Sequence, residues 1–220
     1  MTRKSRTTGR AAPRARRKTR PAARDDARGP DRLPPLRDDE LSAAQRAAAA
    51  ELAAGPRGGV VGPFIAALRS PELMSRLQRL GEYLRYRNGL GPRLTELAIL
   101  ITARAWTQQF EWAMHVDEAR ARGVAPATIA AIARGHRPAR MADDEAVVYD
   151  FLRELHETQV VSDAAYARAL AAFGETGVVD LTALAGYYAT LAMILNVART
   201  PLPPGKRPSL RALPRRRRPR

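Results

Sequence analysis

The segment from residue 94 to residue 103 constrains the fold of this chain more than any other. On a helical wheel its apolar residues cover two opposite faces, namely Leu94, Leu97, Ala98 and Ile101 on one and Ile99, Leu100 and Ala103 on the other. A helix that is apolar on both sides is buried inside a protein. Glu96 falls among the second set, and a buried carboxylate needs a partner or a raised pKa. Glu96 is therefore expected to belong to a structural ion pair or to a functional site.

A stripe of polar residues follows this helix. Gln108, Glu111 and His115 have the spacing that places side chains on one face of a helix, with Trp112 at the border. The residues on the far side, which we expect to face solvent, are Gln109, Asp117 and Arg120. One straight helix would separate Glu96 from His115 by roughly 28 Å. Two packed helices are therefore needed to bring them together, with a break at 105–107 and Thr107 as the predicted N-cap.

This spacing resembles that of the carboxymuconolactone decarboxylase and alkylhydroperoxidase D superfamily. The peroxidase branch carries the motif Glu-x11-Cys-x2-Cys-x3-His, and the matching positions here are Glu96, Gln108, Glu111 and His115. Both cysteines of the motif are therefore replaced, and FEWAMH at 110–115 resembles the cysteine-free, decarboxylase-like members. The segments GPFIAALRSPEL at 62–73 and LAGYYATLAMILNVARTPLP at 184–203 also resemble the family. The resemblance covers about residues 31–204.

The resemblance implies an all-α, alkylhydroperoxidase D-like helical bundle in a single domain. It also implies a cytoplasmic homo-oligomer, a trimer or hexamer, with sites near subunit contacts. The implied activity is that of a cofactor-free lyase in aromatic degradation, which decarboxylates or isomerises a small anionic cyclic carboxylate or lactone. The catalytic residues would be His115, Glu96 and Glu111, with His115 supplying a proton. The substrate-binding residues would be Gln108, Trp112, Gly62, Pro63, Phe64 and Arg104.

Several alternatives stay open from the sequence. His115 can instead be a core histidine satisfied by a buried glutamate, and the glutamates can form a structural network with Arg104. Glu96, Glu111 and His115 also make a conceivable metal-ligand set, although no second histidine lies on the stripe and we expect no metal. An anionic substrate requires a cation, and the core arginines nearest the motif or the Gly-Pro-Phe loop are Arg69, Arg85 and Arg104. Weaker candidates on the last helix are Tyr187, Tyr188 and Asn196.

The charge of the chain lies in its ends. The 220 residues carry a net charge of +16, of which 1–30 contribute +9 and 206–220 contribute +8. Residues 1–30 and 205–220 are therefore predicted to be disordered basic tails around a nearly neutral domain, 31–204. The tails can recruit nucleic acid or another anionic partner, or they can be solvated sequence without a function. A binding or structural protein that kept the fold and lost the reaction is thus the alternative to a lyase.

Composition also limits the chemistry. The chain contains no cysteine, which disfavours the dithiol peroxidase reaction. No apolar run reaches the ~20 residues of a membrane span, so no membrane association is expected. The predicted helices cover about 38–54, 63–69, 71–87, 92–105, 108–122, 126–133, 143–158, 163–173 and 177–199. In the third of these, Leu73, Leu77, Leu80 and Leu84 are expected to face inward.

Overall fold

The computed structural model describes residues 29–213, and all regular elements within that range are helical. The all-α expectation is confirmed. Of the predicted tails, 1–30 and 205–220, residues 1–28 and 214–220 lie outside the described residues. The elements are a 3-10 turn η1 (Asp38–Glu40) and the helices α1 (Ala43–Ala54), α2 (Pro63–Ala67), α3 (Pro71–Tyr86), α4 (Pro92–Ala105), α5 (Gln109–Ala121), α6 (Pro126–Ala133), α7 (Asp143–Thr158) and α8 (Asp163–Ala198).

Prolines start four of these helices, because a proline at the first helical position costs no hydrogen bond. The predicted starts of α3 at Pro71 and α4 at Pro92 are confirmed. The predicted helix at 38–54 is divided, because Ser42 forms a capping box with Gln45 at the start of α1. Thr107 is not the N-cap of α5. It adopts a left-handed conformation with φ 47°, and the cap is Gln108, which accepts a hydrogen bond from the backbone N–H of Phe110.

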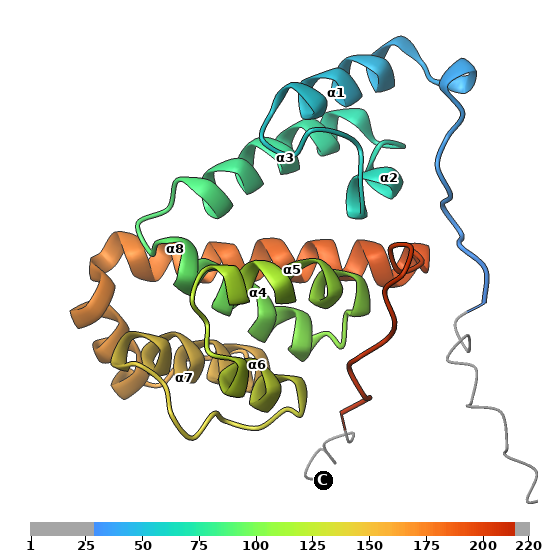
Figure 1. Cartoon of the computed structure of the whole chain (residues 1–220). Helices are drawn as coiled ribbons and strands as arrows, with labels where there is room; N and C mark the ends of the chain where they lie inside the picture. Colours follow the sequence, from blue (N-terminus) through green and yellow to red (C-terminus); the bar gives the residue numbers. More distant parts are fainter. Residues whose placement is uncertain (1–28, 214–220) are drawn as a thin grey trace, which may run out of the picture.

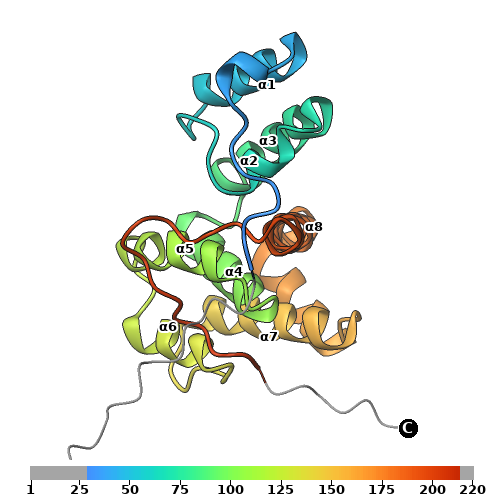
Figure 2. The same ribbon diagram turned by 90° about the vertical axis from the view of Figure 1, so that its right-hand side faces the viewer.

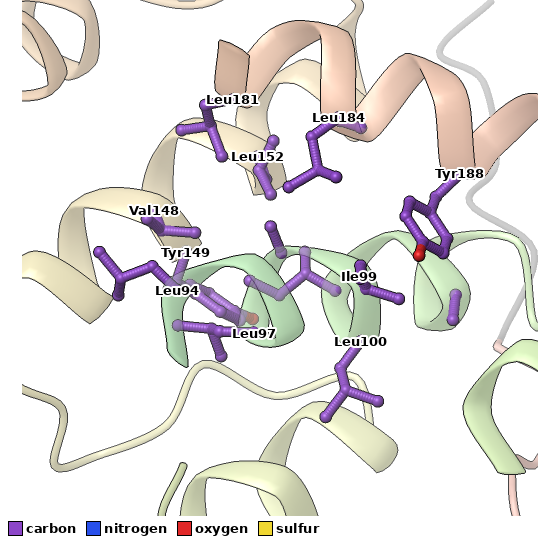
Figure 3. Packing of buried hydrophobic residues seen from close by; sticks show 14 of the residues in the cluster. Leu94, Leu97, Ile99, Leu100, Val148, Tyr149, Leu152, Leu181, Leu184 and Tyr188 are labelled. Atoms are coloured by element: carbon purple, nitrogen blue, oxygen red, sulfur yellow. The ribbon is translucent and has the colours of Figure 1, made fainter. Parts of the chain in front are cut away.

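Helix α4 lies at the centre of the fold and packs against α3, α5, α6, α7 and α8. Helices α1, α2 and α3 lie on one side of α8, and α4 to α7 lie on the other (Figures 1 and 2). Leu152 from α7 and Leu181 and Leu184 from α8 pack in the core above α4 (Figure 3). Every residue of α4 from Leu94 to Arg104 is buried, as the two apolar faces predict. The burial of this helix is what places Glu96 inside the protein.

Helix α3 presents a different face to the core from the predicted one. Leu84 is buried, but Leu73 and Leu80 are 48% and 47% exposed. The buried residues of α3 are Met74, Gln78, Gly81 and Leu84. The leucine spacing alone does not define the face, because α8 packs where Gly81 leaves room for its Tyr187, and α1 packs on α3 as well. The prediction that Leu73 and Leu80 face inward is therefore wrong.

Helix α8 joins the two last predicted helices, with a kink at Gly174, whose φ is 65°. Its length and composition would suffice for a membrane span, which the sequence analysis did not expect. More than half of its most apolar 18-residue window is buried inside the protein, as in the core helix of a soluble protein. Length and composition are therefore weak evidence that α8 crosses a membrane.

The segments that flank the helices follow the domain surface. The backbone N–H of Arg32 donates to the carbonyl of Ala198 over 2.7 Å, which ties the N-terminal segment to the end of α8. At the other end, residues 199–213 run from α8 past α5 towards α6 (Figure 2). Leu210 is buried there, and the side chain of Gln109 bonds to the backbone of Ser209 and Leu210. Gln109 therefore does not face solvent as predicted, because the C-terminal segment covers it.

Candidate active site

Packing of α4 against α5 brings Glu96 and His115 together. Nδ1 of His115 lies 2.7 Å from Oε2 of Glu96, and both side chains are buried. The second carboxylate oxygen, Oε1, lies 3.4 Å from Nη2 of Arg85 on α3. Three helices therefore meet at one carboxylate.

The charges of this group are coupled. Burial opposes ionisation of Glu96, but the hydrogen bond from His115 and the charge of Arg85 outweigh it, so the pKa of Glu96 lies below 4.5. Burial lowers the pKa of His115 below 6.5, against the opposing effect of Glu96. The arrangement is therefore an ionised glutamate that accepts a hydrogen bond from Nδ1–H of a neutral histidine. The other ring nitrogen, Nε2, is then left without a proton and can act as a base.

Glu111 lies one helical turn before His115 on α5, and its environment is the opposite of that of Glu96. It is only 3% exposed, and neither carboxyl oxygen has a hydrogen-bond partner among residues 29–213. Burial raises its pKa well above 4.5. Glu111 is therefore a protonated carboxylic acid beside a neutral imidazole. Two titratable groups with pKa values shifted in this way form a natural acid and base pair.

These groups line a cavity of about 160 Å³. Glu111 and His115 form part of its wall, and the predicted mouth residues Gly62, Pro63 and Phe64 form another part. Gly62 has φ 57°, and a Cβ at this position would come within 2.7 Å of the ring of Phe110. A glycine is therefore required there, both for its backbone conformation and for the close approach of the loop to α5.

Two arginines place positive charge at the cavity. Arg85 is one of the three that the sequence analysis named, whereas Arg57 was missed. The guanidinium of Arg57 lies 4.9 Å from the ring centre of Phe64, and its Nη2 lies 3.3 Å from the hydroxyl of Tyr187. The Nε groups of both arginines are buried without a hydrogen-bond partner in the described part of the chain. The only sequence signal for Arg57 was its place in the glycine-rich loop that precedes Gly62.

Tyr188 of α8 also lines the site. Its ring contacts that of His115 edge to face, with 5.2 Å between the ring centres. Its buried hydroxyl has no hydrogen-bond partner among the described residues, and burial raises the pKa of Tyr188. The neighbouring Tyr187 does not line the cavity but holds Arg57, and burial raises the pKa of Tyr187 to about 12. Both hydroxyls are therefore neutral at neutral pH, and that of Tyr187 accepts a hydrogen bond from Arg57.

Three residues predicted to bind substrate do not line this cavity. Gln108 caps α5 and donates to Asn196 of α8 over 2.9 Å, so it joins two helices. Trp112 belongs to the apolar core. Arg104 lies near the C-terminal end of α4 and lines a different cleft. Gln108 and Trp112 lie on or beside the same stripe as Glu111 and His115. They do not reach the cavity because Gln108 stands at the start of α5 and Trp112 packs between helices.

The arrangement of acids and histidines also bears on the metal-ligand alternative. Within residues 29–213, no group of three or more His, Asp or Glu side chains is placed to hold a metal ion. Glu96 directs one oxygen to His115 and the other to Arg85. The contacts of Glu96 are thus those of a hydrogen-bonded ion pair, and Glu111 takes no part in them.

Comparison with known proteins identifies the fold. Residues 71–154, from the start of α3 into α7, match the sequence model of the carboxymuconolactone decarboxylase family. This range includes Arg85, Glu96, Glu111 and His115. This segment of the chain is therefore similar to the carboxymuconolactone decarboxylase family. The expected family resemblance is thereby confirmed, whereas the cysteine-free, decarboxylase-like branch stays a prediction. No curated protein matches the chain by sequence.

Two solved structures are similar to this one. The first is an alkylhydroperoxidase AhpD core, an uncharacterized peroxidase-related protein from Ralstonia eutropha JMP134. It has a TM-score of 0.64 and 16% identity, and the match covers 79% of this chain and 93% of that one. The second is a protein of unknown function from Agrobacterium tumefaciens, whose name suggests an antioxidant defence protein AhpD. It has a TM-score of 0.56 and 22% identity, with coverage of 62% and 94%. At these identities the similarity establishes the fold alone.

Proposed function

We propose that this protein is an acid–base enzyme, a lyase that decarboxylates or isomerises a small cyclic carboxylate or lactone without a cofactor. The observation that carries the proposal is the pair of shifted groups in one cavity. Glu111 holds a proton that it can donate, and Nε2 of His115 can accept one. General acid–base catalysis by positioned groups of this kind contributes about 10²–10⁴ in rate.

The proposed decarboxylation uses Glu111 and the two arginines of the cavity, and the proposed isomerisation uses Glu111 and His115. Loss of CO₂ from a carboxylate leaves an electron pair on carbon, which is delocalised onto a conjugated carbonyl oxygen. The free N–H groups of Arg57 and Arg85 stabilise that oxyanion or a second carboxylate of the substrate. Glu111, and not His115 as expected from the sequence, then delivers its proton to carbon. In an isomerisation, Nε2 of His115 first removes a proton from one carbon, and Glu111 returns one to another.

The superfamily also includes peroxidases, and a peroxidase function is disfavoured here. The motif positions of the two redox cysteines are Gln108 and Glu111, and the chain has no cysteine at all. A dithiol mechanism needs two thiols to form the disulfide. A homo-oligomeric, cytoplasmic enzyme of aromatic degradation accords with the proposal. A non-catalytic protein whose tails bind anionic partners is the alternative.

A turnover assay tests the proposal directly. CO₂ release from a carboxylactone is measured for the wild type, His115→Ala and Glu111→Gln, and folding is checked by circular dichroism. CO₂ release by the wild type that collapses in the folded Glu111→Gln protein supports the proposed decarboxylation, and its loss in His115→Ala shows that the imidazole takes part as well. Absence of turnover in the wild type across a panel of cyclic carboxylates, together with salt-sensitive nucleic-acid binding that requires the tails, favours the non-catalytic alternative.

A further inference from the structure

A second cleft, of about 460 Å³, opens near the C-terminal end of α4. Helices α4 and α7, the end of α6 and the C-terminal segment form its walls. Among residues 29–213, none lines both this cleft and the candidate active site. Arg104, which was expected in the active site, lies here instead.

Arg104 is buried, and part of its guanidinium group makes no hydrogen bond. It is 5% exposed, and its Nε and Nη1 atoms have no hydrogen-bond partner within the described range. An arginine stays protonated in proteins, so this is a charged group removed from water. Burying such a charge is costly unless a partner compensates it. The unpaired N–H groups of Arg104 therefore point to a ligand that is an anion.

The remaining walls define what kind of anion fits. Arg134 and Arg153 add positive charge, and Glu157 pairs with Arg153 over 3.6 Å. His136 and His156 also line the cleft, and His156 lies 3.1 Å from the hydroxyl of Thr102. One end of the cleft is thus basic and rich in hydrogen-bond donors.

The other part of the wall is apolar. Ile101 from α4, Ile132 from α6 and Leu213 from the C-terminal segment contribute aliphatic side chains. Leu213 packs so closely on Gly135 that a Cβ there would overlap it, and the same position lies 3.9 Å from Nε of Arg104. The C-terminal segment therefore covers the charged group with an apolar residue.

We propose that this cleft binds a small organic carboxylate with an apolar body. The carboxylate accepts hydrogen bonds from the free N–H groups of Arg104, and the body lies against Ile101, Ile132 and Leu213. Such a site recognises charge and apolar surface together. It is a binding site separate from the candidate active site, and it stands whether or not the lyase proposal holds.

Histidine NMR gives a readout specific to each site. The chain has three histidines, of which His136 and His156 line this cleft and His115 lines the other cavity. Hexanoate is titrated into the full chain, and the imidazole signals, assigned through His136→Gln and His156→Gln, are followed. The cleft is expected to give saturable shifts of His136 or His156. Hexanoate bound only in the active site would shift His115 alone and would overturn the proposal.

Variants test the role of Arg104 and of the apolar wall. Arg104→Gln is expected to raise the hexanoate Kd at least about tenfold, whereas Arg76→Gln, an exposed control on α3, leaves it unchanged. If Arg104→Gln does not fold, Leu213→Ala decides, because it should weaken hexanoate binding at least about threefold and leave acetate binding unchanged. An unchanged hexanoate Kd in the folded Arg104→Gln protein or in Leu213→Ala, or phosphate binding as tight as hexanoate, contradicts the proposal.

Discussion

Nδ1 of His115 lies 2.7 Å from Oε2 of Glu96, although 18 residues separate the two in the chain. The contact fixes the ring through one nitrogen and leaves the other available towards the cavity. Glu111, one turn earlier on the same helix, is protonated because nothing in the described structure compensates its burial. One glutamate thus serves as the charged partner of the histidine, and the other holds a proton.

The first prediction concerns the charge of Glu96. Glu96→Gln keeps the shape of the side chain but removes the negative charge that raises the pKa of His115. The pKa of His115 should therefore fall further, and the acidic limb of the profile of kcat/KM against pH should move to lower pH. Turnover should decrease at least about tenfold. The pKa is measured by NMR titration of the imidazole, which does not depend on activity.

The matched control for this experiment is Asp117→Asn. Asp117 lies on the exposed side of α5 and pairs with Lys206 and Arg120. Asp117→Asn should leave the pKa of His115 unchanged, since the charge of Asp117 is screened by water and already paired. A His115 pKa that stays constant or rises in Glu96→Gln would show that Glu96 does not carry the charge that faces the ring.

The second prediction concerns stability. The pKa of Glu111 is raised in the folded protein above its ordinary 4.5, so the folded state keeps a proton that the unfolded state releases. Between pH 4.5 and the folded pKa, the unfolded state binds fewer protons and stability falls as pH rises, by about 1.4 kcal/mol per pH unit. Glu111→Gln, neutral at every pH, should lack this loss and should be more stable at neutral pH.

Urea denaturation at a series of pH values, wild type against Glu111→Gln, measures the effect. The two curves of unfolding free energy should converge near pH 4 and separate above it, while turnover by the variant falls about 10²-fold or more. Parallel curves from pH 4 to pH 8 would mean that Glu111 ionises as readily in the folded protein as in the unfolded chain.

Local signals in the sequence sufficed for much of the fold. Pro71, Pro92 and the acidic first turn at Asp143 set helix starts that depend on neighbouring residues only. The two apolar faces of 94–103 predicted a buried central helix. One straight helix would separate Glu96 from His115 by roughly 28 Å, so the packing of this helix against α5 could also be predicted. These inferences need no knowledge of distant partners.

Whether a side chain faces the core or the solvent depends on elements that are distant in the sequence, so local patterns did not predict it. Leu73 and Leu80 have the spacing of a core stripe, yet α1 and α8 cover the adjacent face of α3. Gln109 is buried because a segment about a hundred residues later crosses it. Arg57 reaches the cavity through contacts with Phe64 and Tyr187, which no local pattern predicts.

The third prediction concerns substrate charge. Arg57→Gln removes a cation from the cavity while leaving the acid and base in place, so KM for an anionic substrate should rise about 10-fold or more. The steady-state kinetics of Arg76→Gln, which removes an exposed arginine paired with Glu72 far from the cavity, serve as the control for net charge. Equal KM values for both variants would remove Arg57 from the binding of substrate.

The last prediction compares two glycines inside helices. At Gly81 of α3, a Cβ would overlap the hydroxyl of Tyr187 and come within 2.7 Å of Nη2 of Arg57. Gly81→Ala should therefore destabilise the protein by about 1–3 kcal/mol, as overpacking does, and it should displace the arginine that the third prediction tests. At Gly186 of α8, a Cβ would meet nothing within 4 Å.

Gly186→Ala should instead stabilise the protein by up to about 1 kcal/mol, because alanine favours the helix more than glycine does. Both variants are measured by urea denaturation, with the KM of Gly81→Ala compared with that of Arg57→Gln. A Gly81→Ala protein as stable as Gly186→Ala would mean that α3 and α8 can separate without cost. The close contact that holds Arg57 at the cavity would then be dispensable.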